Sequence, residues 1–138
     1  MTRIKNINVG DALPERAFKP DTAQLFLYDA ALWNAHRIHF DYPYATEVEG
    51  YPGLVIAGPL MGDWLTQCVV DWLGGDGKLV SIEYSNRQAA FIGEVLRTGG
   101  SVIAVDPDTR EAQLELFVKN EANDVIIPGA AVVNFTTD

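Results

Sequence analysis

The chain has 138 residues, 48% of them hydrophobic, with a formal net charge of −9 and a pI near 4.5. This length and composition predict a single domain, residues 1–138, with enough apolar side chains to fill a core. The negative charge repels phosphate groups and anionic lipid headgroups, which argues against nucleic acid and membrane partners.

The N-terminal residues lack the apolar run of a signal peptide, and no segment approaches the roughly eighteen apolar residues of a membrane span. The single cysteine, Cys68, cannot form an internal disulfide and lies in an apolar helical pattern. We therefore expect it to be a small buried hydrophobe. One unpaired cysteine favours a reducing compartment, so we expect a soluble cytoplasmic protein.

Glycine and proline mark the boundaries of the first elements. The stretch up to Phe18 predicts one or two short extended segments, broken near Gly10 and Pro14. Residues 19–22, Lys-Pro-Asp-Thr, supply a helix N-cap, and residues 23–33 have a helical composition. Residues 40–53 indicate a short helical turn followed by a loop.

The longest predicted helix covers residues 58–73 and ends at Gly74 and Gly75. Its apolar residues follow a spacing of three and four, which is the period of a helix with one buried face. They are Leu60, Met61, Trp64, Leu65, Cys68, Val69 and Trp72. We expect Met61 and the two tryptophans to be core residues rather than ligand contacts.

Beyond this helix the pattern changes to long strand-like runs over residues 78–92, 94–106, 110–121 and 125–136. Asp-Pro-Asp-Thr at residues 106–109 predicts a hairpin turn. Pro128 and Gly129 interrupt the last run, which suggests a bulge or a sheet edge. The order predicts an α+β fold in which an antiparallel sheet wraps one long helix, and such a half-covered sheet often completes its burial by dimerising.

Both histidines of the chain, His36 and His39, lie between Asn34 and Asp41. Imidazole is the side chain whose ordinary pKa lets it accept and return a proton near neutrality. Two imidazoles placed beside an amide, a guanidinium and a carboxylate indicate a functional site.

Two spaced blocks of sequence carry a family resemblance. Residues 33–41 read Trp-Asn-Ala-His-Arg-Ile-His-Phe-Asp, residues 49–55 read Glu-Gly-Tyr-Pro-Gly-Leu-Val, and Ala-Gly-Pro follows at 57–59. In these blocks the chain resembles the MaoC-like, or (R)-specific enoyl-CoA hydratase/dehydratase, family. Within that family it is most similar to the acyl-CoA dehydratase and mesaconyl- or itaconyl-CoA hydratase-like sub-group. The resemblance is close over residues 28–60 and implies a hot-dog fold.

The resemblance implies reversible hydration of a 2-enoyl-CoA. It makes His39 the base that activates water, and it makes the backbone N–H of Gly58 the donor to the thioester oxyanion. The family places an aspartate where this chain has Asn34, so we expect the amide to orient the water instead. His36 stands where the family commonly has asparagine, and we expect it to hold the loop in shape.

The resemblance also suggests substrate-binding residues. Arg37 either pairs with Asp41, which we favour, or reaches an acyl carboxylate or a CoA phosphate. Ala57 replaces a histidine common in relatives, which would enlarge or dry the pocket, and Pro59 suits the first helical turn. Arg87 either binds the anionic part of CoA or lies on a solvated face.

We expect a homodimer or a larger assembly that binds acyl-CoA and needs no cofactor besides the thioester itself. No second cluster of ligands completes a metal site with the histidines, so we expect no metal. Two alternatives remain. The chain is a non-catalytic or half-site subunit of a heteromeric hydratase, or it is a hot-dog thioesterase that uses a helix carboxylate such as Asp63 or Asp71.

Overall fold

The computed structural model describes residues 3–136. Its elements in chain order are the 3-10 helix η1 (Arg3–Asn6), strand β1 (Ala12–Phe18), helix α1 (Thr22–Ala31), the 3-10 turn η2 (Arg37–His39), the π-helical turn η3 (Tyr44–Val48), helix α2 (Gly58–Leu73), and strands β2 (Gly77–Tyr84), β3 (Leu96–Asp106), β4 (Glu111–Lys119) and β5 (Val125–Phe135). The predicted order of one long helix followed by strands is therefore confirmed.

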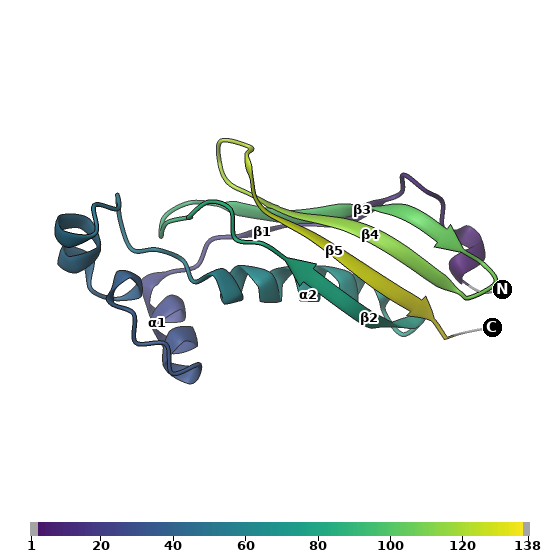
Figure 1. Ribbon diagram of the computed structural model, residues 1–138, viewed down its shortest axis with the longest axis horizontal. Coiled ribbons are helices and arrows are strands. Elements are labelled where there is room, and N and C mark those ends of the chain that lie inside the picture. The colour runs from purple at the N-terminus through teal and green to yellow at the C-terminus, as the bar shows by residue number, and fades with distance from the viewer. Residues whose placement is uncertain (1–2, 137–138) are drawn as a thin grey trace.

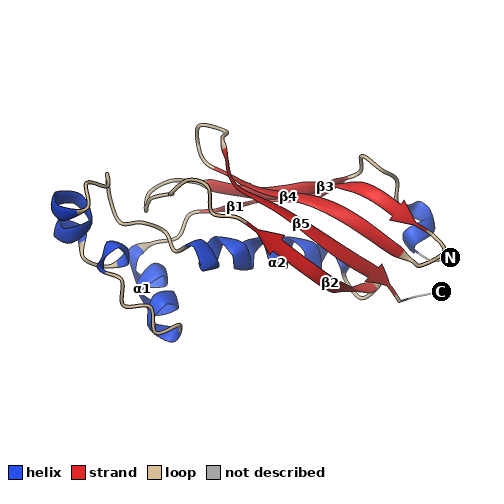
Figure 2. Cartoon of the chain, in the orientation of Figure 1, coloured by secondary structure: helices blue, strands red, loops and turns tan. Residues whose placement is uncertain are grey.

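The strands form one five-stranded antiparallel sheet in the order β1-β3-β4-β5-β2. Helix α2 lies along one face of this sheet, while α1 and the short turns η2 and η3 lie beyond one end of it (Figures 1 and 2). The N- and C-terminal ends lie at the opposite end of the molecule (Figure 1). This is the predicted α+β arrangement of a hot-dog fold.

The core forms where the apolar face of α2 meets the inner face of the sheet. Strand β4 alternates regularly, with Ala112, Leu114, Leu116 and Val118 buried toward the helix. From α2, Leu65 and Val69 are fully buried. Gly129 of β5 allows this contact, because a Cβ there would come within 3.2 Å of a Leu65 methyl group.

Six of the seven core residues predicted on α2 are buried, and the seventh is Trp72. Trp64 is 2% exposed and stacks on Phe18 of β1, with ring centroids 4.4 Å apart. Trp72 is half-buried and meets Phe135 edge to face. Cys68 is buried, and this burial raises the pKa of its thiol, as expected of a structural rather than a reactive cysteine.

Helix α1 begins where the sequence predicts. The side chain of Asp21 accepts a hydrogen bond from the Gln24 backbone at 2.7 Å and caps the helix N-terminus. The helix ends at Ala31, and Trp33 then takes a left-handed backbone with φ of 56°. This turn sends the chain back toward α1, so the backbone N–H of Asn34 donates to the backbone carbonyl of Asp29 at 2.8 Å.

Two strand predictions near Pro128 are wrong. The predicted strand 78–92 ends at Tyr84. β5 is not at an edge, because it pairs with β4 on one side and β2 on the other, and its register shift against β4 falls at Ile126 rather than at Pro128. The Ser85 amide donates to the Pro128 carbonyl at 3.1 Å, but proline has no N–H to return the bond. The assigned strand ends there, but the irregular segment that follows stays bonded to β5, because the Arg87 and Gln88 amides donate to the Ile126 carbonyl at 2.9 and 3.3 Å.

Within residues 3–136, no helix has both the length and the apolar character needed to cross a membrane.

Candidate active site

His39 is held in a fixed orientation at the end of η2. The side chain is buried, 7% exposed, and its Nδ1 lies 2.6 Å from the Val55 carbonyl oxygen. A carbonyl oxygen can only accept a hydrogen bond, so Nδ1 must carry the proton and donate it. This tautomer leaves the lone pair on Nε2, which is the form required of a general base.

His39 lines a cavity of about 250 Å³, which we call the His39 cavity. Its other lining residues come from the segment before α2, from the start of α2 and from the irregular segment after β2: Val55, Ile56, Gly58, Met61, Asn86, Arg87, Gln88 and Ala89. Three residues singled out in the sequence, His39, Gly58 and Arg87, therefore meet around one space. The expectation that Met61 is only a core residue is wrong, because its buried side chain also lines this cavity from the first turn of α2. The guanidinium of Arg87 forms no ion pair with any other residue in the described part of the chain.

Gly58 opens α2 with its backbone N–H available. Ala57 precedes it in an extended conformation and gives no side-chain cap, and Pro59 after it has no N–H at all. No acceptor for the Gly58 amide occurs among residues 3–136. The first amides of a helix carry its positive dipole end, so this N–H suits a developing negative charge beside His39.

Asn34 lies half-buried on the turn after α1, and both ends of its amide have partners. Nδ2 donates to Oδ1 of Asp29 at 3.4 Å, and Oδ1 accepts from the His36 backbone at 3.1 Å. The oxygen retains a second lone pair that can accept from water. Asn34 thus connects the histidine turn to helix α1.

Asp29 is a site residue that the sequence analysis missed. It is 3% exposed, and its Oδ2 lies 4.0 Å from Nδ1 of His39. Oδ2 has no hydrogen-bond partner in the described part of the chain. Burial raises the pKa of Asp29, while His39 and Asn34 act in the opposite direction. The sequence does contain one indication that Asp29 is buried. It lies four residues after Leu25, which is buried, and therefore on the same face of α1.

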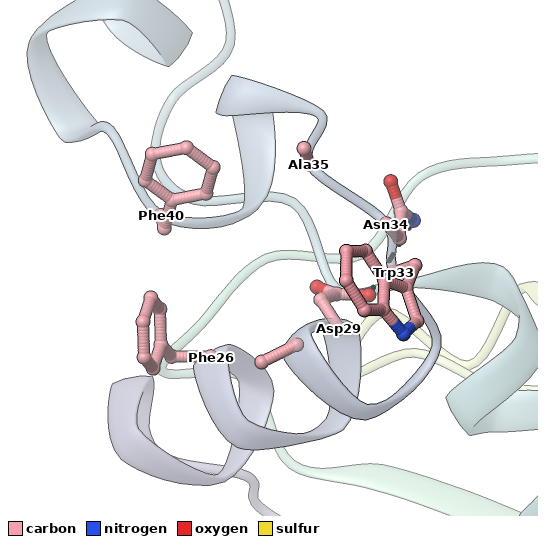
Figure 3. A pocket seen from close by; sticks show the side chains of 7 residues that line it. Phe26, Asp29, Trp33, Asn34, Ala35 and Phe40 are labelled. Atoms are coloured by element: carbon pink, nitrogen blue, oxygen red, sulfur yellow. Dashed lines mark hydrogen bonds between the residues drawn. The ribbon is translucent and has the colours of Figure 1, made fainter.

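This carboxylate lines a second cavity, also of about 250 Å³, which we call the aromatic cavity. It is lined by Phe26, Asp29, Ala30, Trp33, Asn34, Ala35 and Phe40. Figure 3 shows the rings of Phe26 and Phe40 on one side and Trp33, Asn34 and Asp29 on the other. Asp29 and Asn34 are the polar side chains in an otherwise apolar lining.

The other predicted site residues lie outside both cavities. Arg37 pairs with Asp41 at 2.8 Å, as favoured from the sequence, and lies 4.2 Å from the centre of the Tyr44 ring. This pairing lowers the pKa of Asp41. Ala57 is fully buried, and Pro59 is exposed at the start of α2.

His36 is exposed and belongs to the loop rather than to a cavity wall. Its Nδ1 accepts a hydrogen bond from the Ile38 backbone at 3.3 Å and caps η2. These are the contacts of a residue that shapes the turn. Its ring lies edge to face with that of His39, with centroids 5.9 Å apart.

The two helix carboxylates considered for a thioesterase are engaged elsewhere. Asp63 accepts a hydrogen bond from the Tyr28 hydroxyl at 2.8 Å, and Asp71 forms an ion pair with Arg16. Neither lines the His39 cavity or the aromatic cavity. Among residues 3–136, no group of three or more His, Cys, Asp or Glu side chains is arranged to hold a metal ion.

A five-stranded antiparallel sheet laid over one central helix, with a histidine facing the helix start, defines a hot-dog protein of the MaoC-like hydratase/dehydratase class. The fold is similar to that of the (R)-hydratase from A. caviae involved in PHA biosynthesis, with a TM-score of 0.87, 17% identity, and coverage of 96% of this chain and 99% of that chain. It is also similar to a chain of the ChsH1–ChsH2 complex from Mycobacterium tuberculosis, with a TM-score of 0.81, 17% identity, and coverage of 94% and 98%.

The family model for hydroxyacyl-thioester dehydratase type 2 matches residues 3–92. The chain belongs to this family.

Two relatives share shorter stretches at higher identity. Mesaconyl-C(4)-CoA hydratase of Chloroflexus aurantiacus is 55% identical over 53 residues, which is 38% of this chain and 19% of that protein. The mitochondrial hydroxyacyl-thioester dehydratase type 2 of Schizosaccharomyces pombe is 48% identical over 44 residues, 32% of this chain and 15% of that protein. The matched stretch is thus less than a fifth of each relative's length.

Proposed function

We propose that the protein catalyses the reversible hydration of a 2-enoyl-CoA to a 3-hydroxyacyl-CoA. The observation that carries this proposal is the meeting of two groups around the His39 cavity. One is an imidazole whose Nδ1 is committed to the Val55 carbonyl, and the other is the unpartnered N–H of Gly58. Membership of the dehydratase family and the partial match to a mesaconyl-CoA hydratase support the same reaction.

In the hydration direction, Nε2 of His39 takes one proton from water as the water oxygen bonds to C3. The electron pair of the C2–C3 double bond moves toward the thioester, and its carbonyl oxygen gains negative charge. The Gly58 N–H donates to that oxygen, a contact worth about 3–4 kcal/mol of transition-state stabilisation in comparable sites. Return of a proton to C2 completes the 3-hydroxyacyl thioester and restores neutral His39.

We assign to Asn34 the supporting role of orienting the water through the second lone pair of its Oδ1, although it lines the aromatic cavity and not the His39 cavity. Arg87, unpaired at the cavity wall, is the residue we assign to the anionic part of CoA. Arg37 is the weaker candidate, because Asp41 already neutralises it. The reaction needs no cofactor beyond the thioester, because both proton transfers use His39 and water.

The assembly we propose is a homodimer or larger homo-oligomer. Pairing of unlike subunits is the alternative, since a similar fold occurs in a complex named for two proteins, ChsH1 and ChsH2. The amide at position 34, where the family pattern has a carboxylate, is the feature that keeps this alternative open.

The test is hydration of crotonyl-CoA and of a bulkier enoyl-CoA, followed by loss of the enone absorbance. We expect activity in the wild type, a loss of roughly 10²–10⁴-fold in His39→Ala, and near-normal rates in the matched control His36→Ala. An inactive purified chain that gains activity when co-expressed with a neighbouring gene product supports the half-site subunit instead. Release of free CoA without hydration supports a thioesterase.

A further inference from the structure

The carboxylate of Asp29 is a buried polar group that the proposed mechanism does not use. It belongs to α1 and lines the aromatic cavity, and Figure 3 shows it beside Asn34. Its side chain is 4% exposed, and its hydrogen-bond partner in the described part of the chain is the Asn34 amide, at a long 3.4 Å to Oδ1. Oδ2, which is the atom nearer His39, has no partner there.

A buried, half-satisfied carboxylate costs stability, so its presence calls for a physical reason. An apolar residue or an asparagine at position 29 would avoid that cost. The distance from Oδ2 to Nδ1 of His39, 4.0 Å, is too long for a hydrogen bond, and the Nδ1 proton is already donated to Val55. Any action of Asp29 on His39 is therefore electrostatic. Between two buried groups, such an interaction is several times stronger than it is in water.

We propose that Asp29 is the charge partner of His39, a positioning residue whose carboxylate stabilises the imidazolium formed when His39 takes a proton from water. This inference rests on the proposed hydratase function. Asp29 would then supply the negative charge that the family pattern places at position 34, moved five residues back onto α1.

This role also accounts for the amide at position 34. Nδ2 of Asn34 donates to Asp29, and a carboxylate in its place would put two negative groups about 3.4 Å apart. Positions 29 and 34 are therefore complementary: one carries the carboxylate, and the other carries the amide that donates a hydrogen bond to it. An exchange of the two side chains, Asp29→Asn with Asn34→Asp, should preserve this arrangement.

Other titratable or charged groups near the pair come from three directions. His36 lies beside His39 on the same turn, with ring centroids 5.9 Å apart. Arg87 lines the His39 cavity from the segment after β2, and Tyr28 lies next to Asp29 on α1. The test must therefore separate the effect of Asp29 from theirs.

The presence of only two histidines in the chain makes that separation direct. Imidazole signals of His36 and His39 are followed by NMR against pH in wild type, Asp29→Asn and the control Asp71→Asn. We expect the titration midpoint of His39 to fall in Asp29→Asn, because an imidazolium without its carboxylate loses a proton more readily. The midpoint of His36 should stay in place, and Asp71→Asn should leave both unchanged.

Kinetics give the second readout. Asp29→Asn should lower kcat for enoyl-CoA hydration about ten-fold or more while KM stays within about two-fold, and it should move the acid limb of the pH profile to lower pH. Asn34→Asp should also lower kcat, and the exchanged double variant should recover most of the rate. The exchange would also restore a merely structural hydrogen bond, so the discriminating readout is the acid limb of the pH profile, which a merely structural Asp29 would leave in place.

Two outcomes overturn the inference: an unshifted His39 titration in Asp29→Asn, or wild-type kcat in that variant. If Asp29→Asn does not fold, Asp29→Ser is titrated in its place with the same expectation. A wild type that hydrates no enoyl-CoA, but whose His39 midpoint falls in Asp29→Asn, overturns the proposed function and leaves the charge pairing intact. The two failures are thereby distinguishable.

Discussion

The side-chain amide of Asn86 lies directly against the Cα of Gly58. A Cβ added at position 58 would clash with the side-chain amide of Asn86 unless that side chain moved. The glycine leaves room for this amide, whereas its backbone angles do not call for glycine, because position 58 is the first residue of an ordinary helix. Contact between the helix start and the segment after β2 thus sets the width of the His39 cavity.

Gly58→Ala should leave the fold intact and reduce hydration. The exposed Asn86 side chain can rotate away, so we expect little loss of stability, but the displaced amide and the new methyl group obstruct the Gly58 N–H. A drop of about ten-fold or more in kcat/KM is the expected result, measured on crotonyl-CoA beside a thermal melt. Adding Asn86→Ala should recover much of the rate. Full activity in Gly58→Ala alone would contradict the assigned role of this amide.

Arg87 and Arg37 form a matched pair for testing CoA binding. Each substitution to alanine removes one positive charge, but Arg87 lines the cavity unpaired whereas Arg37 is neutralised by Asp41. We expect Arg87→Ala to raise KM for an enoyl-CoA about ten-fold, equivalent to about 1.4 kcal/mol, with kcat little changed. Arg37→Ala should change KM less than two-fold.

The two arginine substitutions also test whether Arg87 contacts the phosphates of CoA. The KM effect of Arg87→Ala should shrink at high salt and vanish for an enoyl thioester of pantetheine, which lacks the nucleotide phosphates. Equal effects of both arginine substitutions would reject the assignment of Arg87.

Asp29→Asn should stabilise the protein at alkaline pH. Because burial raises the pKa of Asp29, the native state holds this proton more tightly than the unfolded chain does. The favourable contribution of this bound proton to the free energy of unfolding is complete below the pKa that Asp29 has in the unfolded chain. It is lost as pH rises through the pKa that Asp29 has in the native state. The variant should therefore melt about 2–4 °C above wild type near pH 8, and the difference should narrow toward pH 4.

Differential scanning calorimetry from pH 4 to pH 8 measures whether the melting temperature of Asp29→Asn exceeds that of wild type. Asp71→Asn, which removes an exposed carboxylate, serves as the control and should show no such trend. A variant that is less stable than wild type at pH 8 would mean that the Asp29 carboxylate stabilises the fold.

Cys68 should resist thiol reagents in the native state. The side chain is 3% exposed, and its raised pKa leaves little thiolate. We expect labelling by a disulfide reagent to be slow at pH 8 and to reach one thiol per chain only when denaturant is added. Since the chain has one cysteine, the signal has a single source. Complete native labelling within seconds would contradict the packing at this position.

Features set by local physics were predictable from the sequence. Helix α2 follows from apolar residues spaced by three and four and from the glycines that end it, and the β3–β4 hairpin follows from its turn residues. The Asp21 cap is equally local. Each of these depends on residues within a few positions of one another.

Features set by distant contacts were not predictable in the same way. The end of β2 depends on Pro128, which lies more than forty residues later in the chain. Asp29 reaches His39 because Trp33 turns the chain back in a left-handed conformation that its residue type does not suggest. The histidine block was readable as a site, but its carboxylate neighbour was not.

Pro128 lies where the assigned pairing of β2 with β5 ends, and it withholds one backbone donor from Ser85. The chain after Tyr84 nevertheless stays attached to β5, because the Arg87 and Gln88 amides both donate to the Ile126 carbonyl, at 2.9 and 3.3 Å. These two residues also line the His39 cavity. One wall of the proposed substrate site is therefore anchored to the central sheet, so we expect substitutions in β5 to alter substrate binding without touching the substrate.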